Sequence, residues 1–136
     1  DDYYNAVTAL AASRLFDSVA HLDVYKKYGR GYYGQVIDDP PHAAVERALK
    51  AMKANNICLE INAAGMRFLN EFYPSPRIMR MAREAGLNNI TVGSDSHRPA
   101  DLGKDIERAI GYARSFGFTG VCTYTRRKPS RISLEK

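Results

Sequence analysis

The stretch Ile90-Thr91-Val92-Gly93-Ser94-Asp95-Ser96-His97 decides the fold. Three β-branched residues that lead into Gly and small polar residues are typical of a buried strand that runs into a loop. Asp95 and His97 are two positions apart, so both side chains point to one side of an extended chain. A carboxylate and an imidazole at the carboxyl end of a strand form a candidate metal-ligand pair. The alternative is an Asx turn beside an exposed histidine.

The rest of the chain alternates between helical and strand-like patterns. Strands are expected over 16–22, 57–62, 89–93 and 120–124, and helices over 3–14, 38–55, 75–86 and 104–115. Segments 24–33 and 63–73 are expected to be loops, and a basic tail closes the chain. This order predicts an α/β fold of parallel strands with helical crossovers, either a small open sheet or part of a (β/α) barrel. Polar residues at the carboxyl ends of such strands converge on the ligand site.

Composition favours one globular domain with its own core. The 136 residues are 45% hydrophobic and 26% charged, which is ordinary for such proteins. The net charge of +5 is compatible with nucleic-acid binding, but the sequence has no basic run interleaved with aromatic residues. A small anionic substrate explains the excess of positive charge equally well. No apolar run is long enough for a membrane span. Cys58 and Cys122 are expected to be buried free thiols in a reducing compartment, the cytoplasm.

The remaining candidate site residues each have a second explanation. His21 and Asn62 end two of the expected strands, yet a lone histidine after an apolar run is more often a hydrogen-bonded core residue. Glu60 lies inside an apolar strand, so its carboxylate must either have a hydrogen-bonding or cationic partner or belong to a functional site. Arg67 and Arg98 suit bidentate binding of a phosphate, or else form surface salt bridges.

Several blocks of the sequence resemble those of the histidinol-phosphate phosphatases of the PHP (polymerase and histidinol phosphatase) superfamily. The blocks are colinear and cover nearly the whole chain. They are Phe16-Asp17-Ser18-Val19-Ala20-His21-Leu22-Asp23 with Lys26-Lys27-Tyr28-Gly29, Glu60-Ile61-Asn62-Ala63-Ala64-Gly65-Met66-Arg67, Tyr73-Pro74-Ser75-Pro76, Gly93-Ser94-Asp95-Ser96-His97-Arg98-Pro99 with Asp101-Leu102-Gly103, and Arg127-Lys128-Pro129.

This resemblance implies a distorted (β/α)7 TIM-like barrel with a trinuclear cluster of zinc, iron or manganese ions. It implies that His21, Asp95 and His97 are metal ligands, with Asp95 and His97 at the catalytic centre. Arg67 and Arg98 are candidates for holding the phosphate, and Asn62 is a further candidate. The implied reaction is hydrolysis of L-histidinol phosphate to L-histidinol and phosphate in histidine biosynthesis.

The chain lacks the amino-terminal His-x-His block and other ligands of that family. We therefore expect residues 1–136 to be the C-terminal portion of a single barrel domain, which needs the missing N-terminal half as its partner and is inactive alone. Two alternatives stay open: a PHP phosphoesterase of other specificity, such as a nuclease or nucleotide phosphatase, and a metal-free PHP-like binding or structural module.

Overall fold

The computed structural model describes residues 1–135. The helices are α1 (Asp2–Ser13), α2 (Lys26–Tyr33), α3 (His42–Ala54), α4 (Gly65–Phe68), α5 (Pro76–Glu84) and α6 (Ile106–Ser115). The strands are β1 (Ser18–Val19), β2 (Cys58–Asn62), β3 (Ile90–Gly93), β4 (Gly120–Thr125) and β5 (Lys128–Ser133). Two short 3₁₀ helices, η1 (Gly34–Asp38) and η2 (Pro99–Asp101), complete the chain.

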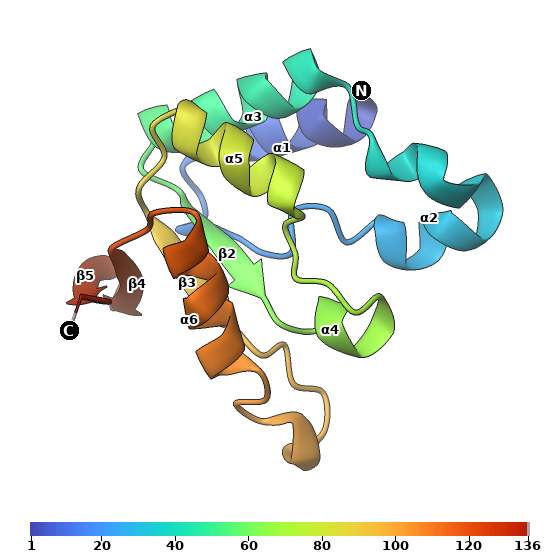
Figure 1. Ribbon diagram of the computed structural model, residues 1–136. Coiled ribbons are helices and arrows are strands. Elements are labelled where there is room, and N and C mark those ends of the chain that lie inside the picture. Colours follow the sequence, from blue (N-terminus) through green and yellow to red (C-terminus); the bar gives the residue numbers. More distant parts are fainter. Residues whose placement is uncertain (136) are drawn as a thin grey trace.

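The first three strands form a parallel sheet in the order β1-β2-β3. Helix α3 lies in the connection from β1 to β2, and α5 lies in the connection from β2 to β3 (Figure 1). The predicted α/β class with helical crossovers is therefore confirmed. The register pairs Asn62 with Gly93, so β2 and β3 end side by side and their following loops leave the same edge of the sheet.

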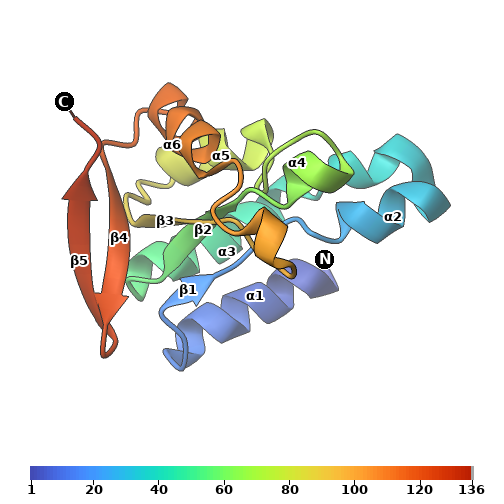
Figure 2. The same cartoon turned by 90° about the horizontal axis from the view of Figure 1, so that it is seen from below.

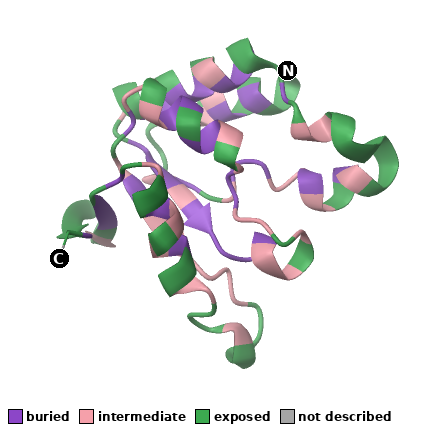
Figure 3. Cartoon of the chain, viewed as in Figure 1, coloured by how far each residue is buried: buried purple, intermediate pink, exposed green. Residues whose placement is uncertain are grey.

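The core lies between the sheet and the helices that cover one of its faces. Figure 1 shows α1, α3 and α5 together on this side, and Figure 3 shows that their sheet-facing surfaces are buried. Leu59 and Ile61 of β2 are fully buried in one cluster with Val45, Leu49 and Met52 of α3. The alternation that separates these residues from Cys58, Glu60 and Asn62 on the opposite face follows from the two-residue period of a strand.

The prediction that the fourth strand is parallel is wrong, and the basic tail contains a further strand, β5. β4 lies beside β3 but is hydrogen-bonded to β5 in an antiparallel hairpin (Figure 2). Arg126 and Arg127 form its two-residue turn with φ of 50° and 64°, the backbone that a type I′ hairpin turn requires. The Arg127 guanidinium donates to the Asp17 carboxylate at 3.0 Å, which ties the turn to the segment before β1.

Segment 24–33, expected to be a loop, contains α2. The ammonium of Lys26, the first residue of α2, lies 2.8 Å from the carboxylates of both Asp23 and Glu71. Arg30, one turn later, pairs with Glu71 at 2.9 Å and with Asp38 at 2.9 Å. These ion pairs hold the helix despite its two glycines.

Two other local predictions differ from the structure. The segment expected to be a loop over 63–73 contains the single turn α4. The strand expected over 16–22 is reduced to Ser18–Val19, because His21 has a φ of 33° and leaves the extended conformation. Within residues 1–135, no helix combines the length and the apolar composition that crossing a bilayer requires.

Candidate functional site

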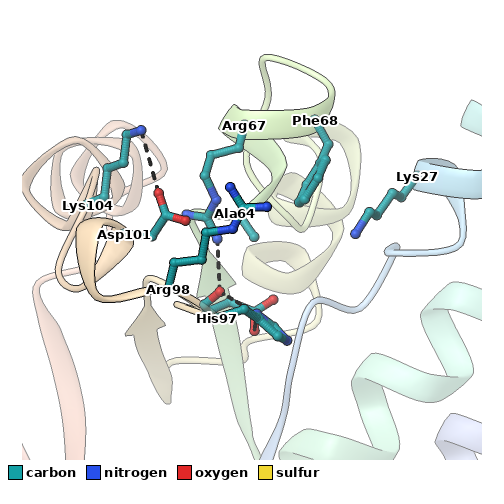
Figure 4. Close-up of a pocket in the computed structure, with 9 residues that line it drawn as sticks. Lys27, Ala64, Arg67, Phe68, His97, Arg98, Asp101 and Lys104 are labelled. Atoms are coloured by element: carbon teal, nitrogen blue, oxygen red, sulfur yellow. Dashed lines mark hydrogen bonds and ion pairs between the residues drawn. The ribbon is translucent and has the colours of Figure 1, made fainter.

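A cavity of about 510 Å³ opens where the strands of the parallel sheet end (Figure 4). It is lined by Lys27, Ala64, Arg67, Phe68, Asp95, His97, Arg98, Asp101 and Lys104. The structure thus brings together four of the predicted site residues, Arg67, Asp95, His97 and Arg98. They come from α4 and from the loop after β3, the two segments that follow neighbouring strands.

Asp95 and His97 interact directly at the start of the loop after β3. The Nδ1 atom of His97 lies 3.0 Å from the backbone oxygen of Asp95 and 3.6 Å from its carboxylate. The His97 side chain is 83% exposed and that of Asp95 is 33% exposed. Asp95 has a φ of 49°, a left-handed conformation that aspartate tolerates better than most residues. Both side chains are therefore accessible from the cavity.

Arg67 connects the loop after β2 with the loop after β3. Its Nη2 donates to the backbone oxygens of Ser94 at 3.0 Å and Asp95 at 2.9 Å. Its Nη1 is buried and has no hydrogen-bond partner within residues 1–135. Buried N–H groups are nearly always paired in folded proteins, so this donor is available to an oxyanion bound in the cavity.

Glu60 holds the other two predicted residues at the same edge of the sheet. Its Oε2 accepts hydrogen bonds from the backbone N–H of His21 at 3.1 Å and from Nδ2 of Asn62 at 2.9 Å. Asn62 in turn accepts a bond from the backbone N–H of Ala64 at 2.9 Å. The cavity lining within residues 1–135 includes neither His21 nor Asn62. Glu60 thus ties the ends of β1 and β2 together.

The donors in this chain fit a metal ion only as part of a ligand set. His21 Nδ1 is buried without a hydrogen-bond partner among the described residues, as expected of an atom that binds a group from outside the chain. In the same part of the chain, no three His, Cys, Asp or Glu side chains are grouped to hold an ion. A metal cluster at this edge would need additional ligands.

Sequence reasoning missed the other five residues that line the cavity, which are Lys27, Ala64, Phe68, Asp101 and Lys104. Lys27 comes from α2, with its Nζ 3.7 Å from the ring centre of Phe68. Lys104 lies 3.7 Å from the Asp101 carboxylate, at the opposite end of the pocket in Figure 4. Lys27, Ala64 and Asp101 lie inside the sequence blocks that carry the family resemblance, which was the available signal. Phe68 and Lys104 carry no such signal.

The fold and the site together define a class of protein. It is an α/β protein whose parallel strands end at an open cavity with four cationic side chains, Lys27, Arg67, Arg98 and Lys104, and two carboxylates. Such a cavity is suited to a small anionic ligand.

Known proteins with similar sequences narrow this class. The chain is 36% identical over 128 residues to a probable histidinol-phosphatase of Deinococcus radiodurans, which covers 93% of this chain and 46% of that protein. It is 27% identical over 117 residues to a protein of the same name from Thermotoga maritima, covering 86% and 48%. No protein-family model matches the chain.

The resemblance to histidinol phosphatases predicted from the sequence is therefore confirmed for most of this chain. The matches fall in the C-terminal portion of those proteins. The chain spans about half the length of the curated relatives it matches.

Proposed function

We propose that this chain is the C-terminal part of a metal-dependent phosphomonoesterase that hydrolyses L-histidinol phosphate to L-histidinol and phosphate in histidine biosynthesis. The observation that carries the proposal is the unpaired Nη1 of Arg67 in a cavity that also contains Arg98, Asp95 and His97. The names of the relatives support the substrate. The proposal includes a distorted (β/α)7 barrel completed by the N-terminal half, and a cytoplasmic location, which the free thiols of Cys58 and Cys122 favour.

In the proposed reaction, the two arginines bind and orient the phosphate. Arg67 is fixed by its bonds to the carbonyls of Ser94 and Asp95, so its free N–H needs little reorganisation to meet a phosphate oxygen. Such preorganised donors are most effective where negative charge develops in the transition state. Arg98 provides a second guanidinium from the loop after β3.

His21, Asp95 and His97 are the proposed donors for divalent ions, zinc, iron or manganese. The chemistry that such ions supply when bound is a water nucleophile of lowered pKa and neutralisation of phosphate charge. A trinuclear cluster requires ligands from outside residues 1–135, and we therefore expect the isolated chain to have little or no activity.

A metal-free binding module is the second candidate. It is favoured by the lack, within residues 1–135, of any group of three metal-binding side chains. Metal analysis of the full-length protein separates the two candidates, because the phosphatase proposal requires bound divalent ions.

The test is an assay of phosphate release by the full-length protein with added zinc or manganese. L-histidinol phosphate is compared with nucleoside monophosphates and single-stranded DNA. Arg67→Ala is compared with Arg47→Ala, which removes an exposed guanidinium from the outer surface of α3.

We expect the highest kcat/KM for histidinol phosphate and a loss on the order of 10²-fold in Arg67→Ala, with its metal content unchanged. Preference for nucleotides or DNA would indicate another phosphoesterase. Failure to release phosphate from any substrate with any metal would refute the proposal. Loss of metal in Arg67→Ala would show that Arg67 supports the metal site instead.

A further inference from the structure

Three of the four cations that line the cavity have no carboxylate partner. Lys104 is paired with Asp101 at 3.7 Å. Among residues 1–135, no carboxylate lies within ion-pair distance of Lys27, Arg67 or Arg98. These three side chains come from α2, from α4 and from the loop after β3, so they surround the cavity from three directions (Figure 4). Of these three side chains, only Lys27 has no role in the proposed reaction.

The backbone that carries Lys27 is fixed by its neighbour in the sequence. Lys26 is only 2% exposed, and its ammonium lies 2.8 Å from both Asp23 and Glu71. Asp23 also accepts a hydrogen bond from the backbone N–H of Ser75 at 2.9 Å. The start of α2 is thus attached at two points to the segment between α4 and α5. Consecutive residues of a helix point about 100° apart, and Lys27 is therefore directed to a different side from Lys26, toward the cavity.

Phe68 holds the Lys27 ammonium at the cavity without neutralising it. The Nζ of Lys27 lies 3.7 Å from the ring centre of Phe68 and 5.1 Å from that of Tyr28. An aromatic face attracts an ammonium group but carries no net charge. Figure 4 shows the Lys27 side chain extending from α2 toward Phe68 and the interior of the pocket. The full positive charge of Lys27 therefore remains available to an anion.

We propose that Lys27 is a third phosphate-binding residue, which contacts the oxyanion from the α2 side, opposite Arg67 and Arg98. This inference rests on the proposed function, in that the anion is taken to be a phosphate monoester. Two arginines and a lysine supply enough donors for the three non-bridging oxygens of such a dianion. Phe68 is the positioning residue that keeps the ammonium at the cavity.

The test uses the full-length protein and two measurements. One is KM for L-histidinol phosphate, and the other is the dissociation constant for inorganic phosphate by calorimetry. Lys27→Gln is compared with Lys50→Gln, which removes the same charge from an exposed lysine paired with Glu46 on α3. Lys27→Arg restores the charge, and Phe68→Leu removes the aromatic ring. Thermal unfolding verifies that each variant is folded.

We expect Lys27→Gln to raise KM and the phosphate dissociation constant about tenfold, while Lys50→Gln leaves both unchanged. Lys27→Arg should restore most of the affinity, and Phe68→Leu should weaken binding about threefold. Equal constants for Lys27→Gln and Lys50→Gln would overturn the inference and leave the phosphatase proposal standing. If the wild type binds phosphate but does not hydrolyse histidinol phosphate, a tenfold loss in Lys27→Gln still supports Lys27 as an anion-binding residue. Equal loss in Lys27→Arg and Lys27→Gln would mean that the lysine side chain acts through packing, which also contradicts the inference.

Discussion

The buried ion pair at the start of α2 leads to a strong prediction about stability. Lys26 and Asp23 are 2% and 1% exposed, and their charged atoms lie 2.8 Å apart. In Lys26→Met, the Asp23 carboxylate stays buried and keeps one hydrogen bond, which its Oδ2 accepts from the Ser75 N–H. Its Oδ1 has no hydrogen-bond partner within residues 1–135 even before the substitution. The second carboxylate, Glu71, is 25% exposed and keeps its bond to Arg30, so it adds little to the loss.

The expected magnitude follows from these exposures. Removing one partner of a buried ion pair costs about 3–5 kcal/mol, because the remaining charge is left desolvated and unpaired. Asp23→Asn keeps the shape and leaves Lys26 paired with Glu71, so its expected cost is about 1–3 kcal/mol. In the double variant neither charge is left without its partner. Its cost should therefore be about 2 kcal/mol less than the sum of the single variants.

The assay is urea unfolding of the protein at pH 7, followed by circular dichroism, for the two single variants and the double variant. Lys50→Met is the matched control, because its ion pair with Glu46 is exposed and should contribute at most about 1 kcal/mol. A loss in Lys26→Met no larger than that of Lys50→Met would refute the reasoning. Additive single and double variants would show that Lys26 and Asp23 are not coupled.

Three other perturbations test the packing of β2 and of the segments beside it. Gly93→Ala places a Cβ against Oε1 of Glu60. The added methyl group should displace this carboxylate from Asn62 and lower the free energy of unfolding by about 1–3 kcal/mol in a urea titration. Unchanged stability would contradict that contact. Burial raises the pKa of Tyr73 to about 12 from its usual 10.0. Because the unfolded state then loses its proton first, we expect stability to be retained below pH 10 and to fall as the pH rises to 12, and Tyr73→Phe should reduce this fall. Burial also raises the pKa of Cys58 to about 12 from 9.0, so its alkylation by iodoacetamide at pH 8 should be on the order of 10³-fold slower in the folded protein than in urea; equal rates would show an accessible thiol.

The helices and strands that were predicted correctly are those whose signal lies in their own residues. Helix α5 begins at Pro76 after Ser75, and the stripe of Ile78, Met81 and Ala82 that faces the core can be read from spacing alone. Strand β3 was found in the same way from its β-branched residues.

Helix α2 could not be predicted because it is held by contacts with residues far away in the sequence. The β4–β5 hairpin could not be predicted because its turn has an unusual sequence. The pairing of Lys26 with Glu71 joins residues 45 positions apart, and no local pattern reports it. The hairpin turn has arginine at both positions where glycine or asparagine is the usual sequence signal.

The residues that line the cavity also differ in whether the sequence alone could place them there. The common edge of parallel strands was sufficient to bring Arg67, Asp95, His97 and Arg98 to one cavity, because two neighbouring strands end in register there. Lys27 reaches that cavity only through α2, whose position depends on the distant ion pairs.

Arg67 explains why the edge of the sheet becomes a single site instead of two adjacent loops. Its Nη2 bonds to two consecutive carbonyls of the loop after β3, while its backbone belongs to the helix that follows β2. Movement of one loop relative to the other would break these two hydrogen bonds to partly buried carbonyls, each of which contributes about 1 kcal/mol. The geometry of guanidinium allows this bridge and still leaves Nη1 unpaired. The same side chain therefore joins the two segments that line the cavity and also presents a free donor to an anion bound there.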